Sequence, residues 1–334
     1  MYDLSKVVIT SSPHIKASED TRSIMLDVII ALIPAMAVAV FMFGPRALLQ
    51  TAVTVIACVI FEKIFCKAAG RPDSTGDLSA VVTGVLLSFV SPVSAPLWVM
   101  VIGALFSIIF AKCLFGGIGK NFMNPALAGR AFLLASWPVA MTTWVKAGSW
   151  MPILGASQDD INAISGATPL AIIKGSAEGE LPSVFQMFVG QTGGSMGEVS
   201  ALALLIGGAY LVYRKVITIN TPVAFILTVA VITLLFPTGG MGNLDSMLYN
   251  IFGGGLMLGS IFMATDYATS PVTPKGQIAF GIGCGLITCL IRYFGGYPEG
   301  VCYSILLMNC GVWLIDRATR PTKFGAPAKA KKEG

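Results

Sequence analysis

The chain has 334 residues, of which 55% are hydrophobic and 12% charged, and its mean hydropathy is +0.78. A soluble domain carries about 25% charged residues, so this composition excludes an ordinary soluble protein and predicts an integral membrane protein. The Lys and Arg residues behind the net charge of +5 are spread over many short loops, which argues against a nucleic-acid partner.

The first predicted segment is a polar arm over residues 1–23. It lacks the uninterrupted apolar core and the cleavage site of a signal peptide, so we expect it to be retained. Ten apolar stretches follow, and the sequence therefore predicts an all-α protein of about ten transmembrane helices. They cover residues 24–43, 47–66, 78–90, 97–114, 124–142, 199–213, 219–236, 251–264, 277–294 and 300–316.

The third and eighth stretches are too short to cross a bilayer alone, because a spanning helix needs about 20 apolar residues. Each runs into a proline-containing segment, Ser91-Pro92-Val93-Ser94 and Ser270-Pro271-Val272-Thr273 respectively. Both are predicted to be broken helices near the membrane interior.

An internal repeat appears when the chain is compared with itself at an offset of 179 residues. The two proline segments then coincide, and Phe115-Gly116-Gly117 falls on Phe294-Gly295-Gly296 without a gap. Each half holds five stretches, and an odd number predicts two repeats of inverted topology, over residues 24–142 and 199–316. The alternative, that such pairs are simply common in membrane loops, stays open.

The positive charges predict the orientation. If the amino terminus is cytoplasmic, the inside segments hold 17 of the 22 Lys and Arg residues, Lys112 and Lys120 among them. The outside segments hold Arg46, Lys146, Lys174 and Arg292, and Arg130 lies within a span. We therefore expect both termini in the cytoplasm, a basic tail over 317–334, and an extracytoplasmic loop over 143–198.

Metal chemistry is not expected. His14 is the single histidine, and the cysteines show no CxxC pair or metal-ligand spacing. They fall almost entirely in apolar segments and are interpreted as small buried side chains: Cys58, Cys66, Cys113, Cys284, Cys289, Cys302 and Cys310.

Charged residues in apolar stretches are candidate functional groups, because their burial in a membrane is costly. Arg130 lies about 9 Å into its span at 1.5 Å per residue, so it either functions there or extends back to the cytoplasmic interface. Asp27 and Glu62 lie near span ends and are interpreted as ordinary interface residues. Asp266 follows the broken eighth stretch and is the better candidate for a cation or ligand contact.

The loop over 143–198 contains Ser165-Gly166-Ala167-Thr168-Pro169-Leu170. Small residues around Thr168 are expected to leave its hydroxyl accessible to a bulky ligand, and Gly166 permits a turn that presents it. Taken alone, the string is equally compatible with an ordinary turn before a proline.

The same string resembles the site at which a flavin transferase attaches FMN to threonine in the D subunit of Rnf complexes and in the B subunit of the sodium-pumping NADH:quinone oxidoreductase. Further strings over about residues 20 to 320 are similar to that family: Asp77-Leu-Ser-Ala-Val-Val-Thr83-Gly84, Gly116-Gly-Ile-Gly-Lys-Asn121-Phe-Met-Asn124-Pro125-Ala126, Met263-Ala-Thr-Asp266, Tyr297-Pro-Glu-Gly-Val301 and Leu307-Met-Asn309. The short polar arm before Ile24 favours the Rnf D subunit.

This resemblance implies a urea-channel-like fold and an inner-membrane electron-transfer subunit of a ferredoxin:NAD oxidoreductase that moves Na⁺ or H⁺. It implies FMN bound covalently to Thr168, with Ser165, Gly166 and Ala167 around it, and a second, non-covalent flavin such as riboflavin. Contacts to the second flavin are expected from Lys120, Asn121, Asn124, Thr265 and Asp266.

The implied partners are the A, B, C, E and G subunits of an Rnf complex, a flavin transferase and membrane lipid. Three alternatives remain at this point: a solute channel of the urea-transporter type, a purely structural subunit, and the quinone-reducing relative. A channel or a structural subunit would carry no flavin.

Overall fold

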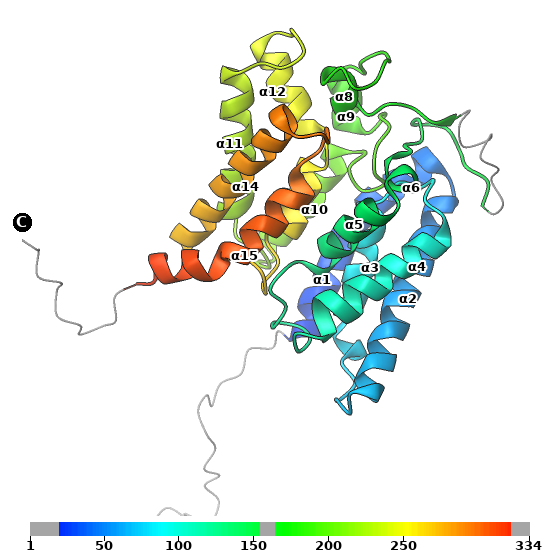
Figure 1. Cartoon of the computed structure of the whole chain (residues 1–334), viewed down its shortest axis with the longest axis vertical. Coiled ribbons are helices and arrows are strands. Elements are labelled where there is room, and N and C mark those ends of the chain that lie inside the picture. The colour runs from blue at the N-terminus through cyan, green and yellow to red at the C-terminus, as the bar shows by residue number, and fades with distance from the viewer. Residues whose placement is uncertain (1–19, 154–163, 322–334) are drawn as a thin grey trace, which may run out of the picture.

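The computed structural model describes residues 20–153 and 164–321, and these residues fold into one bundle of helices (Figure 1). Within these ranges the strand-type pairing is confined to an isolated antiparallel bridge between Val145 and Ser165. The all-α prediction is therefore confirmed for the described part of the chain. Most of the predicted arm over 1–23 and of the tail over 317–334 lies outside it, as does His14.

The first half of the bundle consists of helices that run up and down beside one another. They are α1 (Thr21–Phe43), α2 (Arg46–Ala68), the 3₁₀ turn η2 (Thr75–Asp77), α3 (Ser79–Phe89), α4 (Leu97–Leu105) with the π-helical η3 (Phe106–Cys113), α5 (Pro125–Ser136) and α6 (Pro138–Thr142).

The connecting segment carries the short helices α8 (Pro169–Ile173) and α9 (Val184–Val189), which lie at one end of the bundle near α6 (Figure 1). The second half follows with α10 (Ala201–Tyr213), α11 (Asn220–Leu235), α12 (Asn243–Phe252), α13 (Leu256–Leu258), the π-helical η4 (Gly259–Met263), α14 (Pro274–Phe294) and α15 (Val301–Thr319). Each of the ten apolar stretches contains helix, but the fifth is divided between α5 and α6 and the eighth is interrupted between α12 and α13.

Helix starts follow local chemistry. The Asp20 side chain caps α1 by accepting a hydrogen bond from the Ser23 amide at 2.7 Å. The Asn124 side chain caps α5, and the following Pro125 occupies the first helical position, where a missing N–H has no cost. Thr273 and Pro274 begin α14 in the same way.

Small residues bring helix backbones together. A Cβ atom placed on Gly207 of α10 would lie 2.1 Å from the Ala31 carbonyl oxygen of α1. One on Gly129 of α5 would lie 1.9 Å from the Ser107 hydroxyl oxygen. Close packing through glycine is the usual way in which helices associate in lipid, where apolar burial between helices contributes little.

The eighth apolar stretch is broken at both ends. α12 meets the α13–η4 segment at an angle of 60°. The bend lies at Gly253-Gly254-Gly255, where Gly254 and Gly255 have φ values of +65° and +68°, a region that L-residues with side chains rarely adopt. The helix then ends at Met263, three residues before Asp266.

Four helices, α1, α2, α14 and α15, are long and apolar enough to cross a membrane, and the bent pair of α12 with α13–η4 makes a fifth candidate span. α3, α4 with η3, α10 and α11 are shorter apolar helices. The described chain is therefore a helical protein with several membrane spans.

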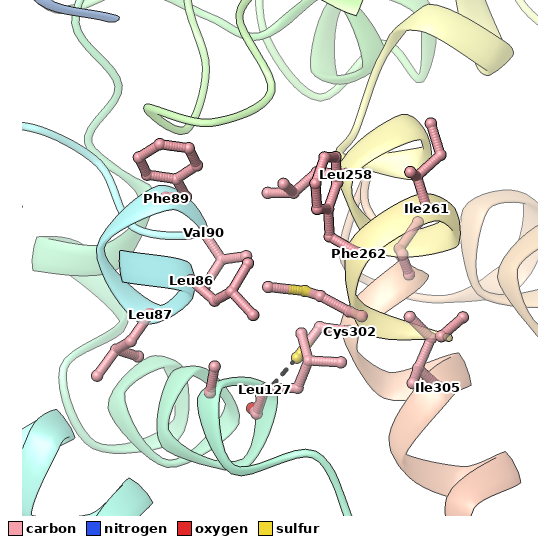
Figure 2. Close-up of a cluster of buried hydrophobic side chains, with 14 of the residues drawn as sticks. Leu86, Leu87, Phe89, Val90, Leu127, Leu258, Ile261, Phe262, Cys302 and Ile305 are labelled. Carbon is pink, nitrogen blue, oxygen red and sulfur yellow. Dashed lines mark hydrogen bonds between the residues drawn. The ribbon is translucent and has the colours of Figure 1, made fainter. Parts of the chain in front are cut away.

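The two halves share one apolar core. In the view of Figure 2, Leu86 and Phe89 of α3 face Leu258 and Phe262 of the α13–η4 segment across the centre of the bundle. Below them, the Cys302 thiol of α15 donates a hydrogen bond to the Leu127 carbonyl of α5 at 3.5 Å. Six of the seven cysteines are buried, as predicted, while Cys310 is exposed.

Candidate functional site

The Thr168 cavity lies at the end of the bundle where α5, α6, α8 and the α14–α15 connection meet. Its volume is about 650 Å³. Thr168 lies in its wall together with Ser165, Gly166 and Ala167, so all four residues of the sequence-predicted site face one cavity. A cavity of this size is in the range that holds a drug-sized or cofactor-sized ligand.

Backbone hydrogen bonds hold the Ser165–Thr168 segment against the residues that follow α6. The Lys146 amide donates to the Ile164 carbonyl, and the Gly166 amide donates to the Trp144 carbonyl, each at 2.9 Å. A Cβ atom on Gly166 would lie 2.7 Å from Cγ of Lys146, so a larger residue would displace that side chain. The small residues therefore permit a close approach of two backbone segments.

Thr168 is the N-cap of α8. Its hydroxyl oxygen accepts a hydrogen bond from the Ala171 amide at 3.3 Å, and Pro169 takes the first helical position. The residue is only 5% exposed. The expectation of an openly accessible hydroxyl is therefore not met, because the cap draws the side chain toward α8.

Aromatic and charged side chains complete the wall of the Thr168 cavity. The rings of Tyr297 and Tyr303 are stacked with their centroids 6.1 Å apart, and both residues line the cavity. Arg130 of α5 also lines it, and its guanidinium forms an ion pair with the Glu299 carboxylate. Arg130 therefore turns toward this end of the bundle and does not extend back to the opposite interface.

Lys174 ties the α8 segment to the α14–α15 connection. Its ammonium donates to the carbonyl oxygens of Gly295 and of Tyr297, the latter at 3.0 Å. Partial burial lowers the pKa of Lys174 below its usual value. These two hydrogen bonds hold the segment that carries Thr168 against the segment that carries Tyr297, on the other side of the cavity.

Glu198, in the connection before α10, lies close enough to the Arg130–Glu299 pair to respond to both charges. Burial raises the pKa of Glu198 to about 7, with Glu299 raising it further and Arg130 opposing the rise. One carboxylate oxygen accepts a hydrogen bond from the Ser195 amide at 2.8 Å. Neither Glu198 nor Glu299 was identified from the sequence as a site residue, because nothing local distinguishes an isolated glutamate in a polar loop.

A second cavity, the Asp266 cavity, lies at the amino-terminal ends of α1 and α5 and has a volume of about 570 Å³. Asn121, Asn124, Thr265 and Asp266 all line it. Asn124 also donates to the Met263 carbonyl at 3.3 Å, which joins the start of α5 to the end of η4. Lys120 is exposed and is not among the lining residues.

A buried ion pair lies at the wall of the Asp266 cavity. Lys112, counted from the sequence among the cytoplasmic-side cations at the end of the fourth apolar stretch, lies inside η3, where its ammonium contacts Glu62 at 2.7 Å and the Ser79 hydroxyl at 2.5 Å. Glu62 is fully buried within the protein. Asp27 is also buried, and it pairs with Arg214 at 3.2 Å.

The two cavities approach each other along α5. Ala126 lines the Asp266 cavity and Arg130 lines the Thr168 cavity, a separation of four residues, or about 6 Å along the helix axis. Apolar core residues such as Leu127 lie between. The two cavities are thus lined by residues one helical turn apart on α5.

These features define a multi-pass helical membrane protein with two internal ligand-sized cavities. A comparison with protein families matches residues 8–325 to the family described as NQR2, RnfD, RnfE. The chain belongs to this family, as its sequence strings indicated.

Curated relatives cover nearly the full chain. It is 48% identical over 329 residues to the D subunit of the Na⁺-translocating ferredoxin:NAD⁺ oxidoreductase complex of Acetobacterium woodii, covering 98% of both chains. It is 44% identical over 326 residues to the D subunit of the proton-translocating ferredoxin:NAD⁺ oxidoreductase complex of Clostridium ljungdahlii, covering 95% of this chain and 96% of the relative. It is 36% identical to the D subunit of the ion-translocating oxidoreductase complex of Halorhodospira halophila, covering 98% and 99%.

Proposed function

We propose that the chain is the D subunit of an ion-translocating ferredoxin:NAD⁺ oxidoreductase complex, in which it passes electrons across part of the membrane. The names and full-length coverage of the relatives support this role. The observation that carries the assignment to a redox chemistry is the Ser-Gly-Ala-Thr segment, which lines a 650 Å³ cavity. Ferredoxin and NAD would be handled by partner subunits.

FMN joined through a phosphodiester bond to Thr168 is the proposed occupant of the Thr168 cavity. The residues present fit such a group: a hydroxyl in the wall, stacked tyrosine rings and a guanidinium are contacts that an isoalloxazine ring and its polar edge can use. When bound, the flavin supplies one- and two-electron redox chemistry, while the protein holds it and adjusts its potential. Ser165, Gly166 and Ala167 form the adjoining wall.

Attachment requires that Thr168 leave its cap position. The hydroxyl is buried and bound to the Ala171 amide, so a flavin transferase must act while the α8 segment is open. We expect the short α8 helix to move, with loss of the hydrogen bonds that Lys174 donates to the Gly295 and Tyr297 carbonyls.

The second, non-covalent flavin is proposed to occupy the Asp266 cavity. Its lining offers the amides of Asn121 and Asn124, the Thr265 hydroxyl and the Asp266 carboxylate, which can bind the polar ring edge and the ribityl hydroxyls of riboflavin. Acid extraction of the purified subunit should release riboflavin and leave FMN on the protein; release of no flavin would contradict this assignment.

Inverted repeats and the proposed orientation have separate support. At the offset of 179 residues, α4 with η3 falls within α14, and α5 falls within α15. Contacts also correspond, since α4 packs on α2 and α5 as α14 packs on α11 and α15.

The proposed orientation leaves a few cations on the outer side, and three of them have a structural role there. The side chains of Arg46, Lys174 and Arg292 each donate hydrogen bonds to backbone carbonyls, so their positions do not contradict the orientation.

The proposed partners are the A, B, C, E and G subunits of the complex, the flavin transferase and lipid. In-gel fluorescence of the denatured wild-type subunit tests the central assignment, because only a covalently bound flavin survives denaturation. A dark band of the mature subunit would remove the redox role and favour the channel or structural alternatives.

A further inference from the structure

A cluster of four charged side chains from both halves of the chain lies beside the Thr168 cavity. Arg130 and Glu299 line the cavity and form an ion pair. Arg292 of α14 is buried, and its guanidinium donates to the Asn250 carbonyl at 2.6 Å and the Gly253 carbonyl at 3.1 Å. Glu198 is the fourth member, and its carboxyl interacts electrostatically with the other three.

Two members of the cluster, Glu198 and Arg292, each have a buried polar atom without a hydrogen-bond partner among the described residues. In Glu198 the Oε1 atom accepts from the Ser195 amide, whereas no partner reaches the buried Oε2 atom; in Arg292 the unpartnered atom is Nε. A Cβ atom on Gly194 would lie 2.6 Å from Oε1, and one on Gly255 would lie 2.9 Å from Oε2. The carboxyl is thus packed against two glycines, and its ionised form is poorly solvated.

We propose that Arg130, Glu299 and Glu198 form a proton-uptake site coupled to the Thr168 cavity, in which Glu198 accepts the proton. The proposal rests on the proposed flavin in that cavity. A flavin held in the cavity would supply the electron acceptor, and the redox partner subunits would supply the electron. When the cavity is reduced, hydronium gives its proton to the Glu198 carboxylate, which forms an O–H bond and leaves a water molecule. When the electron moves on, that O–H bond breaks and the proton returns to water.

The electrostatics give the direction of the coupling. A negative charge added to the cavity raises the proton affinity of every nearby carboxylate. Glu299 forms a direct ion pair with Arg130, whereas within the described ranges no cation forms an ion pair with Glu198, whose pKa burial has already raised to about 7. Glu198 is therefore the group whose protonation changes, and its residue as a whole keeps partial solvent exposure through which a proton can arrive.

The pH range follows from the same facts. Below pH 7 Glu198 is already protonated and takes up nothing when the cavity is reduced. Above pH 7 Glu198 is ionised while the cavity is oxidised and becomes protonated when the cavity is reduced. This proton uptake ends at the pH that exceeds the higher pKa that Glu198 has in the reduced state. The midpoint potential of the covalent flavin should consequently fall more steeply with pH just above 7.

Glu198→Gln tests the proposal in the assembled complex, since glutamine keeps the size and the Ser195 hydrogen bond but cannot titrate. We expect the additional pH dependence of the midpoint potential above pH 7 to disappear, together with the matching fraction of a proton taken up per electron. Glu180→Gln, an exposed glutamate of the same connecting segment outside the cavity lining, should leave the wild-type curve unchanged.

Glu299→Gln is the second variant of this experiment. It removes a negative charge that favours protonated Glu198, so the break in the potential curve should move to lower pH. Two results would overturn the inference. One is a fluorescent Glu198→Gln protein whose midpoint potential depends on pH as in the wild type. The other is a Glu299→Gln protein in which the change of slope occurs at the wild-type pH. A wild-type subunit without fluorescence would instead refute the proposed flavin, so the two failures are distinguishable.

Discussion

The hydroxyl of Thr168 has two mutually exclusive roles: it accepts the hydrogen bond that caps α8, and it is the proposed point of flavin attachment. In the structure the first role holds, with the residue 5% exposed. An esterified oxygen is a weaker acceptor, so we infer that attachment weakens the cap and that the α8 segment adjusts when the flavin is bound.

Thr168→Val should abolish the fluorescent band of the denatured subunit while the chain still inserts into the membrane. The substitution removes only the hydroxyl, and loss of an N-cap oxygen costs about 1 kcal/mol, too little to unfold the bundle. Thr168→Ser keeps a nucleophilic hydroxyl and should retain part of the fluorescence. Ser165→Ala should be milder than Thr168→Val, and a fluorescent Val variant would falsify the attachment site.

Lys112 and Glu62 form a buried ion pair, and removal of one partner should be strongly destabilising. Lys112→Met leaves the buried Glu62 carboxyl without its cationic partner, and breaking a buried pair in this way costs about 3–5 kcal/mol. The double variant Lys112→Met, Glu62→Leu removes both charges and should recover much of that loss. Thermal unfolding in detergent measures both; equal destabilisation by single and double variants would contradict the pairing argument.

At the scale of elements, glycine determines how closely the helices pack and where they bend. Runs of apolar residues predicted the long membrane helices, because such a run bounded by polar segments has few other solutions in lipid. Most of α12 and the 60° bend at Gly253-Gly254-Gly255 were not predicted. A glycine run is equally compatible with close helix packing, and the backbone φ values of the folded chain distinguish the two.

Gly207→Ala should destabilise the contact between α1 and α10. The added Cβ atom would lie 2.1 Å from the Ala31 carbonyl oxygen, a backbone atom that cannot rotate away, and overpacking costs about 1–3 kcal/mol. Gly311→Ala in α15 is the matched control, since its Cβ atom would meet nothing within 4 Å. That control should be neutral or slightly stabilising, because alanine favours helix over glycine by about 1 kcal/mol. Comparable unfolding temperatures for both variants would argue against the close contact.

In the whole molecule, one cavity is lined by the start of α5 and the other by residues further along the same helix, so the orientation of the bundle decides which cavity faces the cytoplasm. The charge distribution predicts that the Thr168 cavity faces outward. The pairing of Arg130 with Glu299 is compatible with that orientation, since the arginine binds a carboxylate from the other half of the chain and is not needed as an anchor at the cytoplasmic interface.

Glu180→Cys should react with an impermeant maleimide added to intact cells, whereas Ala69→Cys should react only after permeabilisation. Both positions are exposed, Glu180 in the segment between α8 and α9 and Ala69 directly after α2. The exposed Cys310 is replaced by serine in both backgrounds to remove its label. Labelling in the opposite order would reverse the proposed orientation.

The helical class, the approximate positions of most apolar helices and the family were predictable from the amino-acid sequence, whereas the division of the fifth and eighth apolar stretches was not. The predictable properties depend on composition, on runs of apolar residues and on short strings, all of which can be read without knowing which residues meet in space. Residues 165–168 were correctly predicted to share one cavity, as were Asn121 and Asn124, because neighbours in sequence remain neighbours in the fold.

Only the tertiary structure decided the partners of the buried charges. Glu62 meets Lys112 from 50 residues away, and Arg130 meets Glu299 from 169 residues away. The burial of Thr168 beneath its own cap and the exposure of Lys120 were decided at the same level. An ion pair depends on the distance between two side chains in the folded chain, and one sequence without the packing of its helices does not contain that distance.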